Sequence, residues 1–68
     1  MSELVFMVEE ATEGGYTARA PGASIVTEAD HLPGLRAAVR DAVRCHFDPA
    51  DLPKLLRLHL ARDEVIAA

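Results

Sequence analysis

Three histidines and a single cysteine are the side chains of this 68-residue chain most suited to metal binding or catalysis. His31, His46 and His59 share no metal-ligand spacing with one another, with Cys45 or with carboxylates on a common helix or tight turn. We therefore expect no metal ion and no cofactor.

His59 is the histidine with acidic residues following it closely in the chain. Asp63 or Glu64 would pair with His59 as general acid and base, but the sequence places no nucleophile or oxyanion-stabilising group beside them. The basic neighbours of Cys45 favour a reactive thiolate only modestly. We therefore expect no enzymatic activity.

A row of arginines forms the most regular charge pattern of the chain. Arg36, Arg40 and Arg44 recur every four residues, which places them along one ridge of a helix. Such a ridge binds the carboxylates of a partner or of a neighbouring subunit, binds the phosphates of nucleic acid, or is only solvated. Eleven acidic against seven basic residues give a net charge of −4, so nucleic acid is the less expected partner.

The length of the chain limits what it can bury. A domain near this size buries about 60% of the surface of its unfolded chain, which leaves room for one small core. With 50% hydrophobic residues but one Tyr, two Phe and no Trp, that core must be aliphatic. Small cores that lack disulfides and metals are often completed by oligomerisation. We expect one domain over residues 1–68 that forms a homodimer or homotetramer.

The cellular location follows from two absences in the sequence. Cys45 is the single cysteine, which excludes an intramolecular disulfide and suits a reducing compartment. The longest early apolar run, residues 4–8, is too short for a signal peptide or a membrane span. We expect a cytoplasmic protein that does not enter a membrane.

Three strands are predicted in the first half of the chain. Residues 3–10 and 16–20 carry β-favouring side chains, and the intervening Gly14 and Gly15 are suited to a hairpin turn. Pro21 and Gly22 end the second strand, and the β-branched run within residues 23–27 predicts a third. These strands form an antiparallel meander.

One helix and a further strand are predicted in the second half. Asp30 is a suitable N-cap for a helix over residues 31–47, and Asp48 with Pro49 ends it. Leucines alternate with other residues over 54–60, which indicates a half-buried strand, and the tail either extends it or returns as a fifth strand. The β-β-β-α-β order predicts an α+β fold, an antiparallel sheet with the helix packed on one face.

The first strand places apolar residues on both faces of the sheet. Leu4, Phe6 and Val8 point to one face, whereas Val5 and Met7 point to the other. An apolar second face indicates a subunit or partner contact. The candidates for such contacts are Val5, Met7, Tyr16, Arg36, Arg40, Arg44, Leu55 and His59.

Part of the sequence is similar to a known family. A hairpin with Glu13-Gly14-Gly15-Tyr16-Thr17-Ala18-Arg19-Ala20-Pro21, then Ser24-Ile25-Val26-Thr27-Glu28 and a helix rich in Ala, Leu and Arg resemble the HicB-type antitoxin domain over about residues 3–47. The resemblance implies a partial RNase-H-like fold, homodimers or tetramers, and neutralisation of a small toxin that cuts messenger RNA. Members of the family usually append a DNA-binding segment, and we expect this shorter chain not to bind an operator.

The leading functional hypothesis is a homo-oligomeric protein-interaction module that neutralises a small toxin-type ribonuclease by masking it. The alternatives are an orphan self-assembling domain without a partner and a weak RNA binder that uses the arginine ridge. A hydrolase on an RNase-H-like scaffold is less expected, because Glu9, Glu10 and Glu13 do not converge as metal-binding carboxylates do.

Overall fold

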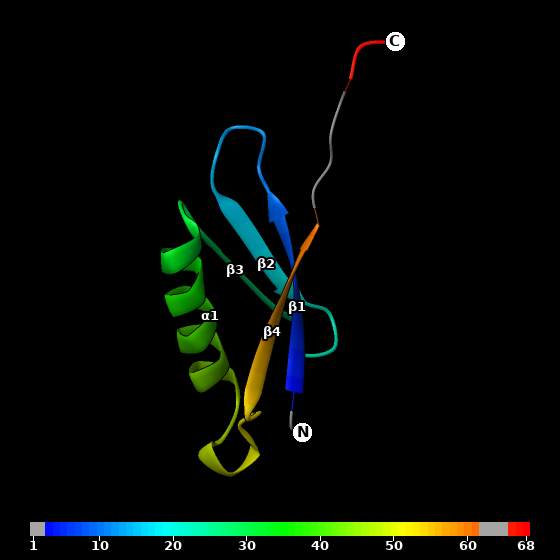
Figure 1. Cartoon of the computed structure of the whole chain (residues 1–68). Coiled ribbons are helices and arrows are strands. Elements are labelled where there is room, and N and C mark those ends of the chain that lie inside the picture. Colours follow the sequence, from blue (N-terminus) through cyan, green and yellow to red (C-terminus); the bar gives the residue numbers. More distant parts are fainter. Residues whose placement is uncertain (1–2, 62–65) are drawn as a thin grey trace.

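A computed structural model describes residues 3–61 and 66–68 of the chain. Its elements, in chain order, are β1 (Glu3–Glu10), β2 (Tyr16–Ala20), β3 (Ile25–Ala29), α1 (Leu32–His46), the short 3₁₀ helix η1 (Pro49–Asp51) and β4 (Leu55–Ala61). The predicted α+β class and the β-β-β-α-β order are confirmed. Figure 1 shows α1 lying against one side of the sheet.

The strands of the described residues form one sheet in the order β3-β2-β1-β4. β2 is antiparallel to both β1 and β3, as the predicted meander requires. β4 is parallel to β1, so the expectation of a wholly antiparallel sheet is wrong at this strand. The reason is that α1 carries the chain back along the sheet between β3 and β4, and such a helical crossover joins parallel strands.

The hairpin between β1 and β2 depends on its two glycines. Gly14 and Gly15 have φ values of 98° and 86°, which side chains other than Gly rarely adopt. The turn is closed by the amide of Ala11, which donates to the carbonyl of Gly15 at 3.0 Å. A Cβ on Gly15 would lie 3.2 Å from the carbonyl oxygen of Ala29 on β3. The predicted glycine turn is therefore confirmed.

Several predicted boundaries differ from the structure by one or two residues. β3 begins at Ile25 because Ser24, with φ of 56°, still belongs to the preceding turn. The N-cap of α1 is His31 and not Asp30, since the Nδ1 atom of His31 accepts the amide hydrogen of Gly34 at 3.0 Å. Whether the tail extends β4 or forms a fifth strand concerns residues 62–65, which lie outside the described residues.

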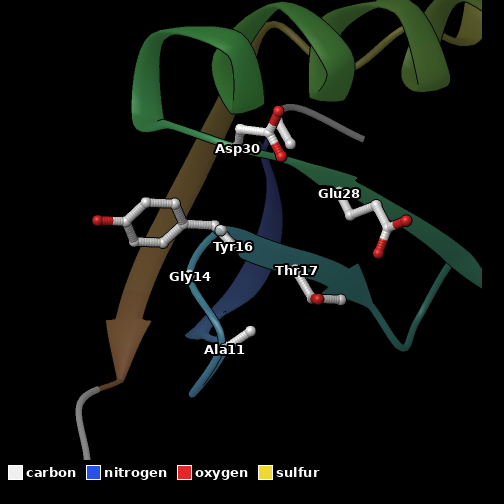
Figure 2. Close-up of a pocket in the computed structure, with 8 residues that line it drawn as sticks. Ala11, Gly14, Tyr16, Thr17, Glu28 and Asp30 are labelled. Carbon is white, nitrogen blue, oxygen red and sulfur yellow. The ribbon is translucent and has the colours of Figure 1, made fainter.

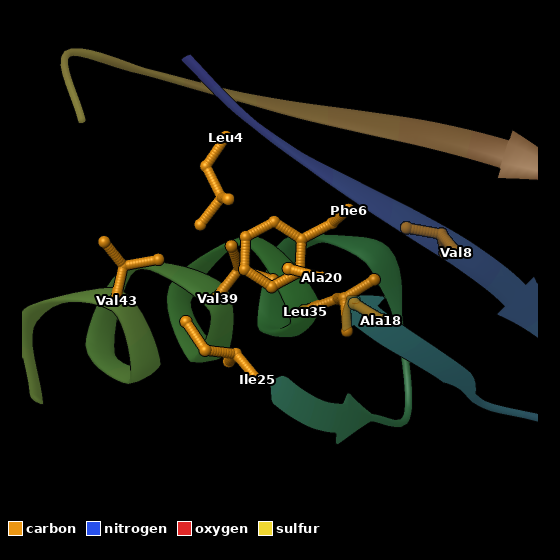
Figure 3. Close-up of a cluster of buried hydrophobic side chains, with 9 residues drawn as sticks. All are labelled: Leu4, Phe6, Val8, Ala18, Ala20, Ile25, Leu35, Val39 and Val43. Carbon is orange, nitrogen blue, oxygen red and sulfur yellow. The ribbon is translucent and has the colours of Figure 1, made fainter. Parts of the chain in front are cut away.

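The core lies between α1 and one face of β1, β2 and β3 (Figure 3). Alternate residues of the strands and every fourth residue of the helix supply it, as the periods of a strand and of a helix require. The buried hydrophobic residues among those described are Leu4, Phe6, Val8, Ala18, Ala20, Ile25, Leu35, Val39 and Val43. Since α1 packs over β3 and β2, it leaves the leucines of β4 only half-buried or exposed.

Candidate protein-interaction surfaces

The face of the sheet opposite α1 carries apolar side chains that are exposed to solvent. We call this surface the open face and define it by Glu3, Val5, Met7, Glu9, Thr17, Arg19, Val26, Glu28, Leu55, Arg57 and His59. Val5 and Met7, on the central strand β1, are 41% and 38% exposed. Strand pairing sets Met7 between Arg19 of β2 and His59 of β4. A row of mixed apolar and basic residues therefore crosses the sheet.

Carboxylates border this row on the open face. Pairing places Glu9 opposite Thr17, and Thr17 opposite Glu28, so two carboxylates flank a threonine across three strands. Glu9 and Glu28 are both exposed. This end of the open face thus has the charge that suits a cationic partner.

An ion pair joins the first and last strands at the other end of the open face. The Nε and Nη2 atoms of Arg57 donate to the two carboxylate oxygens of Glu3 at 2.8 and 3.2 Å. The hydrogen bonds from Arg57 hold the pKa of Glu3 below its ordinary value and raise that of Arg57. Since the side chain of Arg57 is 65% exposed, solvent screens the pair strongly.

A shallow pocket of about 400 Å³ lies beside the β1–β2 hairpin (Figure 2). Its wall includes Glu28 of β3, Asp30 just after that strand, Thr17 of β2 and the hairpin glycines. Figure 2 shows that the side chains of Thr17 and Glu28 project from neighbouring strands, whereas the Tyr16 ring turns away from them. The pocket extends the acidic end of the open face.

A second hollow, of about 430 Å³, separates α1 from β4. We call it the α1–β4 groove. Three cationic side chains and four aliphatic ones line it: Arg36, Arg40, Lys54, Val39, Leu55, Leu56 and Leu58. The groove exists because the helix packs over the β3 and β2 half of this face and does not cover β4. A basic rim over an aliphatic floor suits an extended apolar segment that carries carboxylates.

The structure separates the predicted arginine ridge into two parts. Arg36 and Arg40 line the α1–β4 groove, whereas Arg44 lies one turn further along α1. Arg44 is exposed and forms a 4.0 Å ion pair with Asp41 of the same helix. The first two arginines are therefore the ones placed beside apolar residues.

The other predicted contact residues divide between the two sides of the sheet. Val5, Met7, Leu55 and His59 share the open face, as the alternation of the strands predicts. Tyr16 lies on the opposite side, where it is half-buried and packs against the core. This position fits the role of Tyr16 as a packing residue.

The two remaining residues of chemical interest are at the C-terminal end of α1. Cys45 is exposed. His46 is also exposed, and its ring meets the edge of the Phe47 ring at a centroid distance of 4.9 Å. The last buried residue of α1 is Val43, and the helix ends three residues later at His46.

Three surface residues were not predicted from the sequence. Val26 and Leu60 are 66% and 54% exposed, and Lys54 joins the basic rim of the groove. Leu60 has the same leucine alternation as the half-buried Leu56 and Leu58, but it is exposed.

The polar and charged side chains of the described residues lie at or near the surface. Within residues 3–61, no polar or charged side chain is buried, and no group of three or more His, Cys, Asp or Glu could hold a metal ion. The clear pKa shifts belong to the exposed pair Glu3 and Arg57. No helix of the described part has the length and apolar character needed to cross a membrane.

Two relatives show where the chain belongs. The UPF0150 protein of Archaeoglobus fulgidus is 54% identical over 52 residues, which cover 76% of this chain and 77% of that protein. The UPF0150 protein of Thermotoga maritima is 37% identical over 65 residues, 96% of this chain and 91% of that protein. This chain belongs to the UPF0150 family.

No family model and no solved structure matches this UPF0150 chain. Neither UPF0150 relative is named a HicB-type antitoxin, so the resemblance to that family stays a prediction. The function is therefore argued below from the surfaces of the protein.

Proposed function

We propose that this UPF0150 protein is a homo-oligomeric protein-interaction module without chemistry of its own, which masks a partner protein with the open face of its sheet. The observation that carries the proposal is the exposed apolar centre of that face, Val5 and Met7, bordered by the carboxylates of Glu9 and Glu28. Apolar residues surrounded by polar ones are typical of protein-binding surfaces.

A small toxin-type ribonuclease is the partner that the resemblance to HicB-type antitoxins suggests. A ribonuclease must offer a cationic surface to the phosphates of its substrate. The acidic end of the open face and the net charge of −4 complement such a surface. Masking would then act by occupying the surface on which the RNA binds.

Co-expression with the product of the neighbouring gene tests the proposal. We expect the two chains to copurify in a fixed ratio. Met7→Lys on the open face should weaken the complex by at least about tenfold, because it inserts a charge into the apolar centre of the docking surface. Ala37→Lys, at an exposed position of α1, is the matched control and should change the affinity less than about twofold. Isothermal titration calorimetry gives both values.

Other outcomes favour the alternatives. Equal binding by the Met7→Lys and Ala37→Lys variants would exclude the open face as the docking surface. An oligomer that captures no partner would favour an orphan self-assembling domain. A shift of single-stranded RNA at moderate salt, lost on replacing Arg36 and Arg40, would favour the RNA binder.

A further inference from the structure

We propose that β4 pairs antiparallel with β4 of a second copy, with Leu58 opposite Leu58, to join the two sheets into one of eight strands. The inference rests on the oligomeric part of the proposed function but uses a different surface from the open face. It identifies the subunit contact, and it leaves the open faces of both copies free for a partner.

The outer edge of β4 is available for strand addition. β4 is the last strand of the sheet, and β1 is its one strand neighbour among the described residues. It has seven residues, and none of them is Pro or Gly. A long edge strand with apolar side chains and without such interruptions is a template for pairing with another chain. The other edge strand, β3, has five residues.

The sequence of β4 is self-complementary about its central residue. With Leu58 on a two-fold axis, Leu56 of each copy lies opposite Leu60 of the other, and all seven residues of the strand are paired. Opposite residues then share a face, as antiparallel pairing requires. Six leucines, three from each copy, form one continuous row on the side of the helices. Leu60, which is 54% exposed in the single chain, becomes covered.

Other registers of the β4–β4 pairing are less favourable. A shift that centres the pair on Arg57 sets two guanidinium groups opposite each other, which is unfavourable. A shift that centres it on His59 leaves Leu55 and Leu56 without an opposite residue in the partner strand. A shift by one residue would place the leucines of one copy on the same face of the joined sheet as Arg57 and His59 of the other copy.

Disulfide trapping tests the pairing and its register. In a Cys45→Ser background, Leu58→Cys should give a disulfide-linked dimer under mild oxidation. Directly opposite residues of antiparallel strands have Cα atoms about 4.5–5.5 Å apart, within the range of a disulfide. Leu60→Cys alone should give none, because the two copies of residue 60 would lie about 13 Å apart.

A second disulfide experiment mixes two single-cysteine proteins and leaves the half-buried Leu58 unchanged. Arg57→Cys and His59→Cys proteins, each exposed at the changed position, should link to each other when mixed and each remain unlinked alone. Linkage of Arg57→Cys to itself, or of His59→Cys to itself, would overturn the register.

Sedimentation equilibrium tests whether β4 forms the dimer contact. Leu60→Glu should raise the dimer dissociation constant at least about tenfold, because a carboxylate would be buried opposite Leu56. Val26→Glu, at a residue that is also more than half exposed and lies on the opposite edge strand β3, is the control and should leave the constant unchanged. A monomer at all concentrations, or a dimer lost only in Val26→Glu, would overturn the proposal.

The result can be separated from that of the proposed function. Partner capture by the Leu60→Glu monomer would show that the open face binds without β4 pairing. A β4-linked dimer that captures no partner would support the subunit contact and refute the masking role.

Discussion

Glu3 and Arg57 connect the two parallel strands β1 and β4 through a two-pronged ion pair on the open face. The residues are 54 positions apart in the chain, so the pair links two strands that are adjacent in the sheet but distant in the sequence. The pair also orients the guanidinium of Arg57 on the open face, on the side of β4 opposite Leu56 and Leu58.

Glu3→Gln should make unfolding less dependent on pH in the acidic range. The folded-state pKa of Glu3 lies below its ordinary value of 4.5, so its ion pair stabilises the protein above that pH. This stabilisation is lost as the pH falls through the lowered folded-state pKa. Urea midpoints of wild type and Glu3→Gln should therefore differ at pH 7 and converge in acid.

A double-mutant cycle provides the control. In an Arg57→Met background, Glu3→Gln should have little effect at any pH, because the partner is absent. A Glu3→Gln effect of the same size in both backgrounds would show that the ion pair is not its cause.

The start of α1 depends on an unusual cap. The Nδ1 atom of His31 accepts the amide of Gly34, one of the amides that a helix leaves without an internal partner. Gly34 is suited to this place, because a Cβ there would lie 2.9 Å from the His31 ring. The cap fixes the point at which the helix begins to cross the core.

His31→Ala should lower the free energy of unfolding by about 1 kcal/mol, the usual effect of losing a helix N-cap. His31→Asn keeps a side-chain acceptor and should recover most of that loss. Chemical denaturation followed by circular dichroism measures both variants. Equal destabilisation by Ala and Asn would indicate that the imidazole ring acts through packing and not through the cap.

The described residues form one small core, and of two neighbouring residues of β1 one lies inside it and the other outside it. Phe6 is fully buried at its centre, whereas Val5 points to the open face. A core of this size rarely provides more than about 3–5 kcal/mol, so a single large truncation can remove most of the stability.

Phe6→Ala should therefore cost about 3–5 kcal/mol and leave the chain largely unfolded at room temperature. Val5→Ala should cost less than about 1 kcal/mol. Thermal melts at several protein concentrations measure both effects. A midpoint that rises with concentration would in addition report a folded oligomer. A Phe6→Ala protein that stays folded, with a melting point near that of wild type, would contradict the view of a single core.

The sequence by itself determined the elements and the side of each element that is buried. The alternation of Leu4, Phe6 and Val8 with Val5 and Met7 predicts which face of β1 packs, since a strand has a period of two residues. Gly14 and Gly15 predict the hairpin because their backbone angles suit few other residues. These properties depend on residues close together in the chain.

Only the tertiary structure decided how the elements lie against one another. The position of β4 beside β1, parallel to it, and the placement of α1 over β3 and β2 are set by packing between distant segments. This packing exposes Leu60 although its pattern equals that of Leu58, and it separates Arg40 from Arg44. Local periodicity gives the direction of each side chain, but whether another element covers it depends on long-range contacts, which no local pattern contains.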